Sequence, residues 1–313
     1  MYQGFKELRR APGRSALITT TIGLIAVLVS FLSALTAGLS HQSISALEHL
    51  TEGKTMIVAD NGASTLSGSR VPATLADEVG GTPLYVGRDR VGDTPVAIMP
   101  DPTLSGDTAT VNGTLEAPAD LTLGGKEVHV AGTQDLWLDH VPVVLVSPEN
   151  AAQGEPAAIL VDHEVTAPEG TKVLTGKDIL KTSASYTGEN LSLTTMTTLL
   201  FAISALVVGA FFTVWTIQRL GGIAITLALG AARKVVISDA LTQALLVLVG
   251  GVAAGTLFTI TVASFAPDSL PVSLTWSTTA LPAAILIACG LAGAAFSLFP
   301  IFRVDPRSAL ANA

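Results

Sequence analysis

The chain has 313 residues, of which 13% are charged and 49% are hydrophobic, and its net charge is −8. A soluble domain carries roughly 25% charged residues, so this composition, with a mean hydropathy of +0.56, argues against a wholly soluble protein. The acidic balance argues against nucleic acid as a partner. The single cysteine, Cys289, excludes an intrachain disulfide.

The first 14 residues form a basic arm. Tyr2, Phe5 and Leu8 recur at every third position, and Lys6 and the neighbouring arginines can meet lipid phosphates. Residues 1–14 are therefore predicted to form a cytoplasmic interfacial helix, or simply a basic flank that orients the first span.

The chain contains four apolar blocks. Each reaches the ~20 residues that a helix needs to cross a membrane. The first, Ala16–Leu39, is uncharged and longer than the usual apolar core of a cleaved signal peptide, which favours a span. Its helical pattern continues to Leu50, with Gly53 as a plausible stop. We therefore predict a first transmembrane helix with an extension at residues 15–50, and further spans at residues 194–217, 235–263 and 280–302.

The segment between the first two spans, residues 51–193, is predicted to be a large mixed α/β domain rich in strands. Its short β-branched runs are separated by Gly, Pro, Asn and Asp. The expected strands are Lys54–Asp60, Pro83–Arg88, Thr94–Met99, Ala109–Leu115, Lys126–Ala131, Val141–Ser147, Ala157–Val161 and Thr171–Leu174, with possible helices at Ala73–Val79 and Pro148–Gln153.

Small residues recur in the last two spans. Gly251 and Gly255 form a small-xxx-small step, and Gly290 and Gly293 lie in the fourth span. Such faces let membrane helices approach closely, so we interpret them as helix-packing surfaces, with a substrate groove as the alternative.

The distribution of basic residues sets the orientation. The N-terminal arm, the loop at residues 218–234 and the tail at residues 303–313 all carry basic side chains, whereas the loop at residues 264–279 carries none. Residues 40–193 hold 21 acidic and 8 basic side chains. We therefore expect a multi-pass protein of the plasma membrane with cytoplasmic termini, an extracytoplasmic domain and an external loop at residues 264–279.

Motifs for nucleotide hydrolysis or metal catalysis are absent from the sequence. The nearest match to a phosphate-binding loop, Gly170–Asp178, has the wrong glycine spacing, and Asp178 replaces the required Ser or Thr. The spans carry no ionisable group at mid-membrane, where an ion-coupled transporter usually needs one. We expect a chain that is not an enzyme, without an intrinsic cofactor, and driven by a separate ATPase.

Several segments together resemble a known family. The arm reads FKELRRAPGR, the loop after the second span reads QRLGGIAITLALGAARK, and the tail reads FRVDPRSAL. The chain also has the order of one span, a large domain and three further spans. These segments and this order together resemble the permease subunits of ABC transporters of the FtsX/MacB type. Gly222 and Leu227 stand where the family usually has an acidic and a basic residue.

The resemblance implies a fold, partners and a coupling surface. It implies a membrane α-helical homodimer, four transmembrane helices per copy, bound to a separate ATP-binding cassette subunit. The coupling loop at residues 218–234 would contact that ATPase, through a short helix lying along the cytoplasmic surface. Its candidate contact residues are Gln218, Arg219, Ile223, Ala228, Leu229 and Gly230.

The stretch DLWLDHVPVVLVSPENA and the compact domain are most similar to the haem-exporting HrtB branch. The resemblance implies efflux of a hydrophobic molecule, most simply haem, as a transported ligand. It directs attention to His41, Glu48 and His49 on the helical extension, since imidazole and carboxylate groups can ligate haem iron. His49 and Glu48 are the candidate iron ligands. Ile44, Leu47 and Leu50 are expected to shelter the ring.

Two alternatives stay open at this stage. A related permease could export an antimicrobial peptide or a lipid. An FtsX-like permease could instead transmit force to a cell-wall hydrolase and transport nothing. Solvated polar residues at a helix end would also explain His41, Glu48 and His49.

Overall fold

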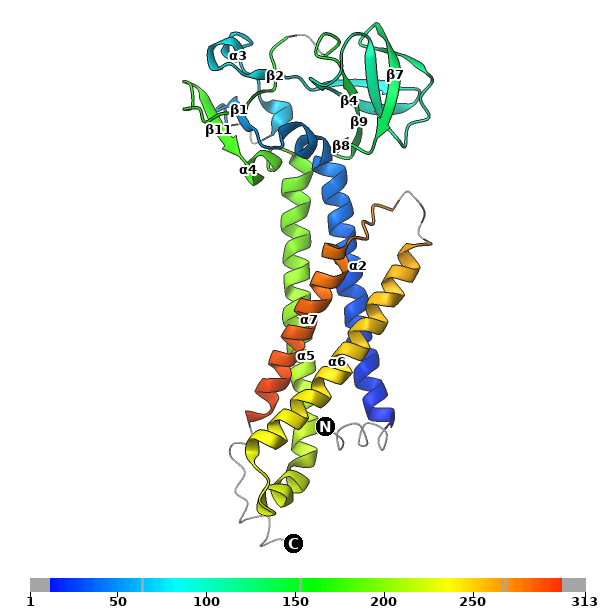
Figure 1. Cartoon of the computed structure of the whole chain (residues 1–313), viewed down its shortest axis with the longest axis vertical. Coiled ribbons are helices and arrows are strands. Elements are labelled where there is room, and N and C mark those ends of the chain that lie inside the picture. The colour runs from blue at the N-terminus through cyan, green and yellow to red at the C-terminus, as the bar shows by residue number, and fades with distance from the viewer. Residues whose placement is uncertain (1–11, 63–64, 152–153, 266, 268–269, 300–313) are drawn as a thin grey trace. The chain divides into compact units, whose positions relative to one another are not determined.

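The computed structural model describes residues 12–62, 65–151, 154–265, 267 and 270–299. Four long helices dominate it (Figure 1): α2 (Pro12–Thr51), α5 (Ala184–Ala228), α6 (Arg233–Ala263) and α7 (Trp276–Ser297). All four are long and apolar enough to cross a membrane. This confirms the prediction of four membrane helices with a strand-rich domain between the first and the second.

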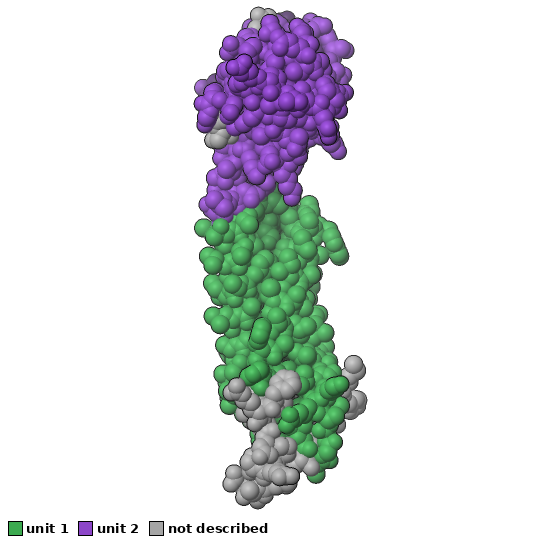
Figure 2. Space-filling view, turned by 90° about the vertical axis from the view of Figure 1, so that its left-hand side faces the viewer, with its two compact units in different colours: residues 1–37, 193–313 green, residues 38–192 purple. Residues whose placement is uncertain are grey.

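The chain divides into two compact units, shown in Figure 2. The helical unit comprises residues 1–37 and 193–313, and the strand-rich domain comprises residues 38–192. Helix α2, with 40 residues, and helix α5, with 45 residues, each have residues in both units. The predicted extension of the first span is thus part of the strand-rich domain, and α2 ends at Thr51, just before Gly53 with φ of +70°.

Glycines allow the helices of the helical unit to pack closely. A Cβ atom at Gly255 would meet the carbonyl oxygen of Gly23 and the side chain of Ala26, so α6 lies directly against α2. A Cβ atom at Gly293 would meet the backbone of α5 at Ala205 and Gly209. The glycine faces of the last two spans are therefore helix-packing surfaces, as the small-xxx-small spacing predicts.

Buried apolar side chains from all four helices form the core of the helical unit. They are Ile18, Ile22, Ala26, Val208, Phe212, Ala244, Val247, Leu248, Val252, Leu286 and Ala294. Hydroxyl groups add links between α2 and α6: Ser30 Oγ lies 3.3 Å from Thr256 Oγ1, and Thr259 Oγ1 lies 3.4 Å from the carbonyl oxygen of Val27.

The strand-rich domain contains two sheets, the short helices α3 (Thr74–Val79) and α4 (Lys177–Leu180), and the 3₁₀ turn η1 (Leu66–Gly68). The first sheet has the order β11-β1-β10-β2 and is antiparallel. The second has the order β3-β4-β9-β5-β7-β6, with β8 paired to β9. The strands are β1 (Thr55–Ala59), β2 (Thr82–Leu84), β3 (Gly87–Val91), β4 (Thr94–Pro100), β5 (Thr108–Asn112), β6 (Asp120–Leu123), β7 (Lys126–Gln134), β8 (Trp137–Leu138), β9 (Val141–Val146), β10 (Ala158–Val161) and β11 (Thr171–Thr175).

Alternating side chains of the central strands enter different cores. In β9, Val143 and Leu145 join a central core, whereas Val144 and Val146 join the core on the other face of the second sheet. Because successive side chains point to opposite faces, a strand buried on both faces reads as a continuous apolar run. The central core also takes Ala46, Leu47 and Leu50 from α2, which fixes the α2 extension against both sheets.

The structure differs from the sequence expectations at several elements. The expected strand Pro83–Arg88 is divided between β2 and β3. Of the helix expected at Pro148–Gln153, residues 148–150 form a turn, and residues 152–153 lie outside the described ones. Strands β6 and β8 were not expected, because they have only four and two residues. Most of the interfacial helix expected at residues 1–14 lies outside the described residues. The tail at residues 303–313 lies entirely outside them.

Candidate functional site

The extension of α2 presents two different faces within the strand-rich domain. Ile44, Leu47 and Leu50 recur at every third position and are 3%, 0% and 4% exposed, because they pack into the domain. The expectation that they shelter a bound ring is therefore wrong. His41, Glu48 and His49 are exposed on the other face.

The two histidines of the α2 extension each face an aspartate of the domain. His41 Nε2 lies 3.0 Å from Asp135 Oδ2, which is a hydrogen bond. His49 Nε2 lies 3.9 Å from Asp101 Oδ2, which is too long for a hydrogen bond. The ring nitrogen of His49 is therefore freer than that of His41 to bind a further group.

Asp101 is 5% exposed. Its Oδ1 atom accepts hydrogen bonds from the backbone nitrogen of Thr103 at 2.8 Å and from Thr103 Oγ1 at 2.7 Å. These bonds fix the carboxylate that faces His49.

The three candidate side chains do not meet in one cluster. Within the part of the chain that the structure describes, no group of three or more His, Cys, Asp or Glu side chains could hold a metal ion. Successive residues of a helix point about 100° apart and rise about 1.5 Å each, so His41 and Glu48 are separated by about 10 Å along the axis. His41 and Glu48 of one α2 extension are thus too far apart along the helix to bind one iron atom together.

A segment that the sequence did not single out as a site, residues 135–140, runs beside the α2 extension. Leu136 and Leu138 are buried in the central core, and Asp135 and Trp137 alternate with them. The Trp137 backbone nitrogen donates to Ser45 Oγ at 2.8 Å, and the indole Nε1 donates to Asp135 Oδ1 at 2.6 Å. The sequence DLWLDH alternates apolar and other side chains, which indicates a strand with one buried face. The contact with α2 cannot be recognised from the sequence.

The turn between β8 and β9 connects this segment to both long helices. Asp139 and His140 have φ of 51° and 63°, the left-handed conformation that a two-residue hairpin turn of this type requires. Their backbone nitrogens donate to the carbonyl oxygens of Ser43 and Gln42 in α2, at 3.1 Å and 2.9 Å.

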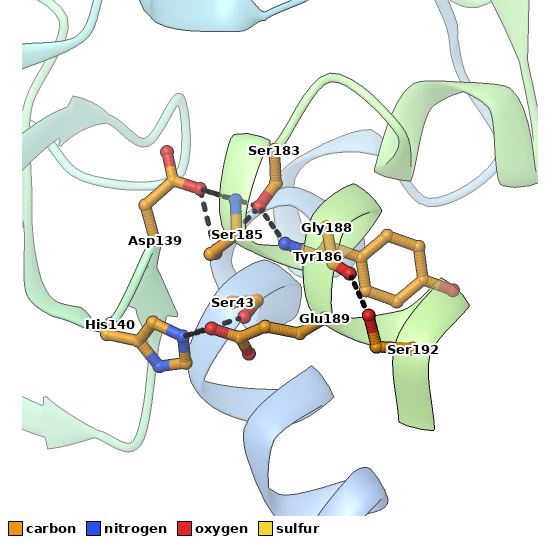
Figure 3. A network of polar contacts seen from close by, with 9 residues as sticks. All are labelled: Ser43, Asp139, His140, Ser183, Ser185, Tyr186, Gly188, Glu189 and Ser192. Carbon is orange, nitrogen blue, oxygen red and sulfur yellow. Dashed lines mark hydrogen bonds and ion pairs between the residues drawn. The ribbon is translucent and has the colours of Figure 1, made fainter. Parts of the chain in front are cut away.

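The side chains of the same turn hold the start of α5 (Figure 3). Asp139 Oδ1 accepts from Ser183 Oγ, Ser185 Oγ and the Ser185 backbone nitrogen, at 2.6, 2.9 and 3.2 Å. His140 Nε2 lies 2.8 Å from Glu189 Oε1 and 3.5 Å from Ser43 Oγ. We call residues 135–140 the clasp, because they contact α2 through Asp135, Trp137 and the turn, and α5 through Asp139 and His140.

The histidines of the strands and loops have local explanations. His129 and His163 pair with Asp120 and Asp162 at exposed positions, and His140 pairs with Glu189. Each of these three histidines therefore has a carboxylate partner within the strand-rich domain.

The coupling segment, residues 218–234, belongs to the helical unit. Helix α5 continues through Ala228 without a break, so Gln218 and Ile223 lie on that helix and not on a separate surface helix. Gly230, with φ of +96°, turns the chain before α6 begins at Arg233. Leu229 at the tip is 85% exposed. The side chains of Arg219 and Ala228 lie outside the described ones.

A narrow cleft lies beside this segment, between α5, α6 and α7. Ile223, Trp215 and Gln243 are among the residues that line it. Gln243 is 5% exposed and donates to Asp239 Oδ2 at 3.0 Å. Ile223 therefore faces this cleft, whereas Leu229 is exposed.

Comparison with known proteins identifies relatives of one kind. Over 142 residues, or 45% of the chain, the sequence is 33% identical to a putative hemin transport system permease protein HrtB of Staphylococcus haemolyticus. Over 148 residues, or 47% of the chain, it is 27% identical to the protein of the same name from Staphylococcus epidermidis. No family model matches the chain. The matches span 40% and 42% of the lengths of these curated relatives. This similarity confirms the predicted resemblance to HrtB-like permeases.

Proposed function

We propose that the chain is the permease subunit of an ABC efflux transporter that exports haem from the membrane. The observation that carries the proposal is the similarity to proteins named as hemin transport permeases, together with four apolar helices of membrane-spanning length. The chain itself would not be catalytic, and a separate ATP-binding subunit would supply the energy.

The proposed orientation follows the basic residues. The strand-rich domain and the loop at residues 264–279 lie outside the cell, whereas both termini and the coupling segment lie in the cytoplasm. The coupling segment, with its exposed Leu229, would then be a cytoplasmic surface accessible to the ATPase. A second copy of the chain completes the transporter.

The proposed ligand site is the exposed face of the α2 extension. His49 and Glu48 would ligate the haem iron, with His41 as a third candidate. Ring nitrogen Nε2 of His49 is not hydrogen-bonded to Asp101, and Glu48 has no hydrogen bond or ion pair to any described residue. Where only one of these side chains reaches the iron, the second axial ligand would come from water or from the other copy.

A titration of the purified full-length chain with ferric haem tests this function. We expect saturable binding with a shifted Soret band, because coordination by imidazole or carboxylate changes the spectrum of the iron porphyrin. If the spectrum with protein is the same as that of haem in detergent alone, haem is not the cargo. That result would favour a permease that exports a peptide or a lipid.

A force-transmitting permease is the second candidate function. The clasp favours it as an alternative, since residues 135–140 bind both α2 and α5, the two helices shared by the helical unit and the domain. The absence of haem binding, combined with capture of a cell-wall hydrolase by the strand-rich domain, would support that alternative.

A further inference from the structure

A flat porphyrin ring needs an apolar surface beside the iron ligands, and the α2 extension does not supply it. Ile44, Leu47 and Leu50 are 3%, 0% and 4% exposed, because they are committed to the interior of the strand-rich domain. These three side chains are therefore not available to a ring held next to His41.

Trp137 of the clasp is an aromatic side chain beside His41. It is half-buried, whereas its neighbours Leu136 and Leu138 are members of the central core. Its backbone nitrogen is held at 2.8 Å by Ser45 Oγ, one helical turn from His41. The indole is thus placed along the same stretch of α2 as the candidate ligands.

Asp135 fixes the indole relative to the imidazole. Oδ1 of its carboxylate accepts the indole N–H of Trp137 at 2.6 Å, and Oδ2 lies 3.0 Å from Nε2 of His41. One carboxylate therefore bridges the two rings. An aromatic ring that is oriented before the ligand arrives loses less conformational freedom on binding.

We propose that Trp137 is a ring-contact residue of the ligand site and that Asp135 positions it beside His41. The ligand class is a planar macrocycle of the porphyrin type, which would stack offset on the indole. This inference rests on the proposed haem-binding function and deepens it, because it names a contact to the macrocycle that does not involve the iron. The other two tryptophans, Trp215 and Trp276, belong to the helical unit.

Metal-free protoporphyrin IX separates ring contact from iron ligation. We would measure the affinity of the purified full-length chain for ferric haem and for protoporphyrin IX, in the parent and in Trp137→Leu. Leu keeps an apolar side chain but removes the aromatic face. The expected result is a loss of about 3- to 10-fold for both probes, the size of an aromatic pair contact. Trp137→Phe keeps an aromatic face but loses the hydrogen bond to Asp135, so it should lose affinity about as Asp135→Ala does, and less than Trp137→Leu.

Two matched controls accompany these variants. The double variant Glu48→Ala, His49→Ala should weaken haem but not protoporphyrin IX, since it removes only candidate iron ligands. Tyr85→Leu changes another half-buried aromatic side chain, which packs against a different core of the same domain, and should leave both affinities unchanged.

The inference is overturned if folded Trp137→Leu binds protoporphyrin IX as tightly as the parent. If that variant does not fold, Asp135→Ala replaces it, because it keeps the indole but removes its hydrogen bond. The affinity for protoporphyrin IX must then fall by at least about twofold. Unchanged affinity overturns the inference. A parent that binds haem but not protoporphyrin IX contradicts the ring contact and leaves the proposed function standing. A parent that binds neither probe refutes both.

Discussion

At the scale of single residues, three aspartates organise the surroundings of the candidate ligands. Asp101 faces His49, Asp135 bridges His41 and Trp137, and Asp139 caps the start of α5. The sequence allowed His41, Glu48 and His49 to be chosen, because their spacing on one helix and the family resemblance are local signals. It did not reveal these aspartates, since their contacts join segments that are distant along the chain.

Asp139→Ala should loosen the first turns of α5. The carboxylate accepts three hydrogen bonds there, and loss of a helix cap costs about 1–2 kcal/mol. Hydrogen exchange of the backbone amides at residues 184–190 should therefore accelerate by about 5- to 30-fold. Asp162→Ala is the matched control, because this exposed carboxyl pairs with His163 and not with α5. The hydrogen bond with His163 lowers the pKa of Asp162. Equal exchange in parent and Asp139→Ala would contradict the capping role.

At the scale of the elements, hydrophobic length and small-residue spacing were sufficient to predict the helices and their packing. Helix α5 begins at Ala184, ten residues before the predicted span at residues 194–217. The sequence does not show this early start, since Ala184–Leu193 is polar and its capping partner Asp139 is distant along the chain. The ring-sheltering role of Ile44, Leu47 and Leu50 failed for a related reason. Their spacing shows an apolar face but not which surface covers it.

Gly255→Leu should separate α2 from α6. A side chain at this position would meet the backbone of Gly23 and the side chain of Ala26, and overpacking of a tight contact typically costs about 1–3 kcal/mol. We expect the purified protein to unfold in detergent at a lower temperature than the parent. Gly250→Leu is the control, because nothing lies within 4 Å of a Cβ atom there. Similar losses in both variants would argue against close packing at Gly255.

A charged pair in the coupling segment should uncouple transport from ATP hydrolysis. We predict that Ala228→Glu with Leu229→Glu abolishes stimulation of the ATPase subunit and haem export. Haem binding should persist, because the ligand site would lie across ~30 Å of hydrocarbon. Phe265→Glu, an exposed position just after the opposite end of α6, is the control. Normal export by the double variant would refute the role of this segment.

At the scale of the whole molecule, the number of membrane helices and the position of the strand-rich domain followed from the sequence. The strand order did not, because it depends on non-local pairing. Strand β9 lies between β4, to which it is parallel, and β5, to which it is antiparallel. Periodicity identifies such strands but carries no information about their neighbours.

The predicted orientation can be measured with impermeant thiol reagents on intact cells. In a Cys289→Ser background, a cysteine at the exposed Glu149 should react, whereas one at the exposed Ile225 should not. Both should react once the cells are opened. Labelling of Ile225→Cys but not Glu149→Cys in intact cells would reverse the orientation and remove the basis for a cytoplasmic coupling segment.

The affinity of the Glu48→Ala, His49→Ala variant for ferric haem tests the central claim most directly. Both side chains are exposed on the strand-rich domain, so their removal should leave the fold intact. We predict that the variant loses most haem affinity, and that 1 M salt hardly affects the parent, because salt screens exposed charges over ~3 Å but does not disrupt coordination to iron. Unchanged affinity in the variant, or loss of binding by the parent in high salt, would contradict ligation of haem at the α2 extension.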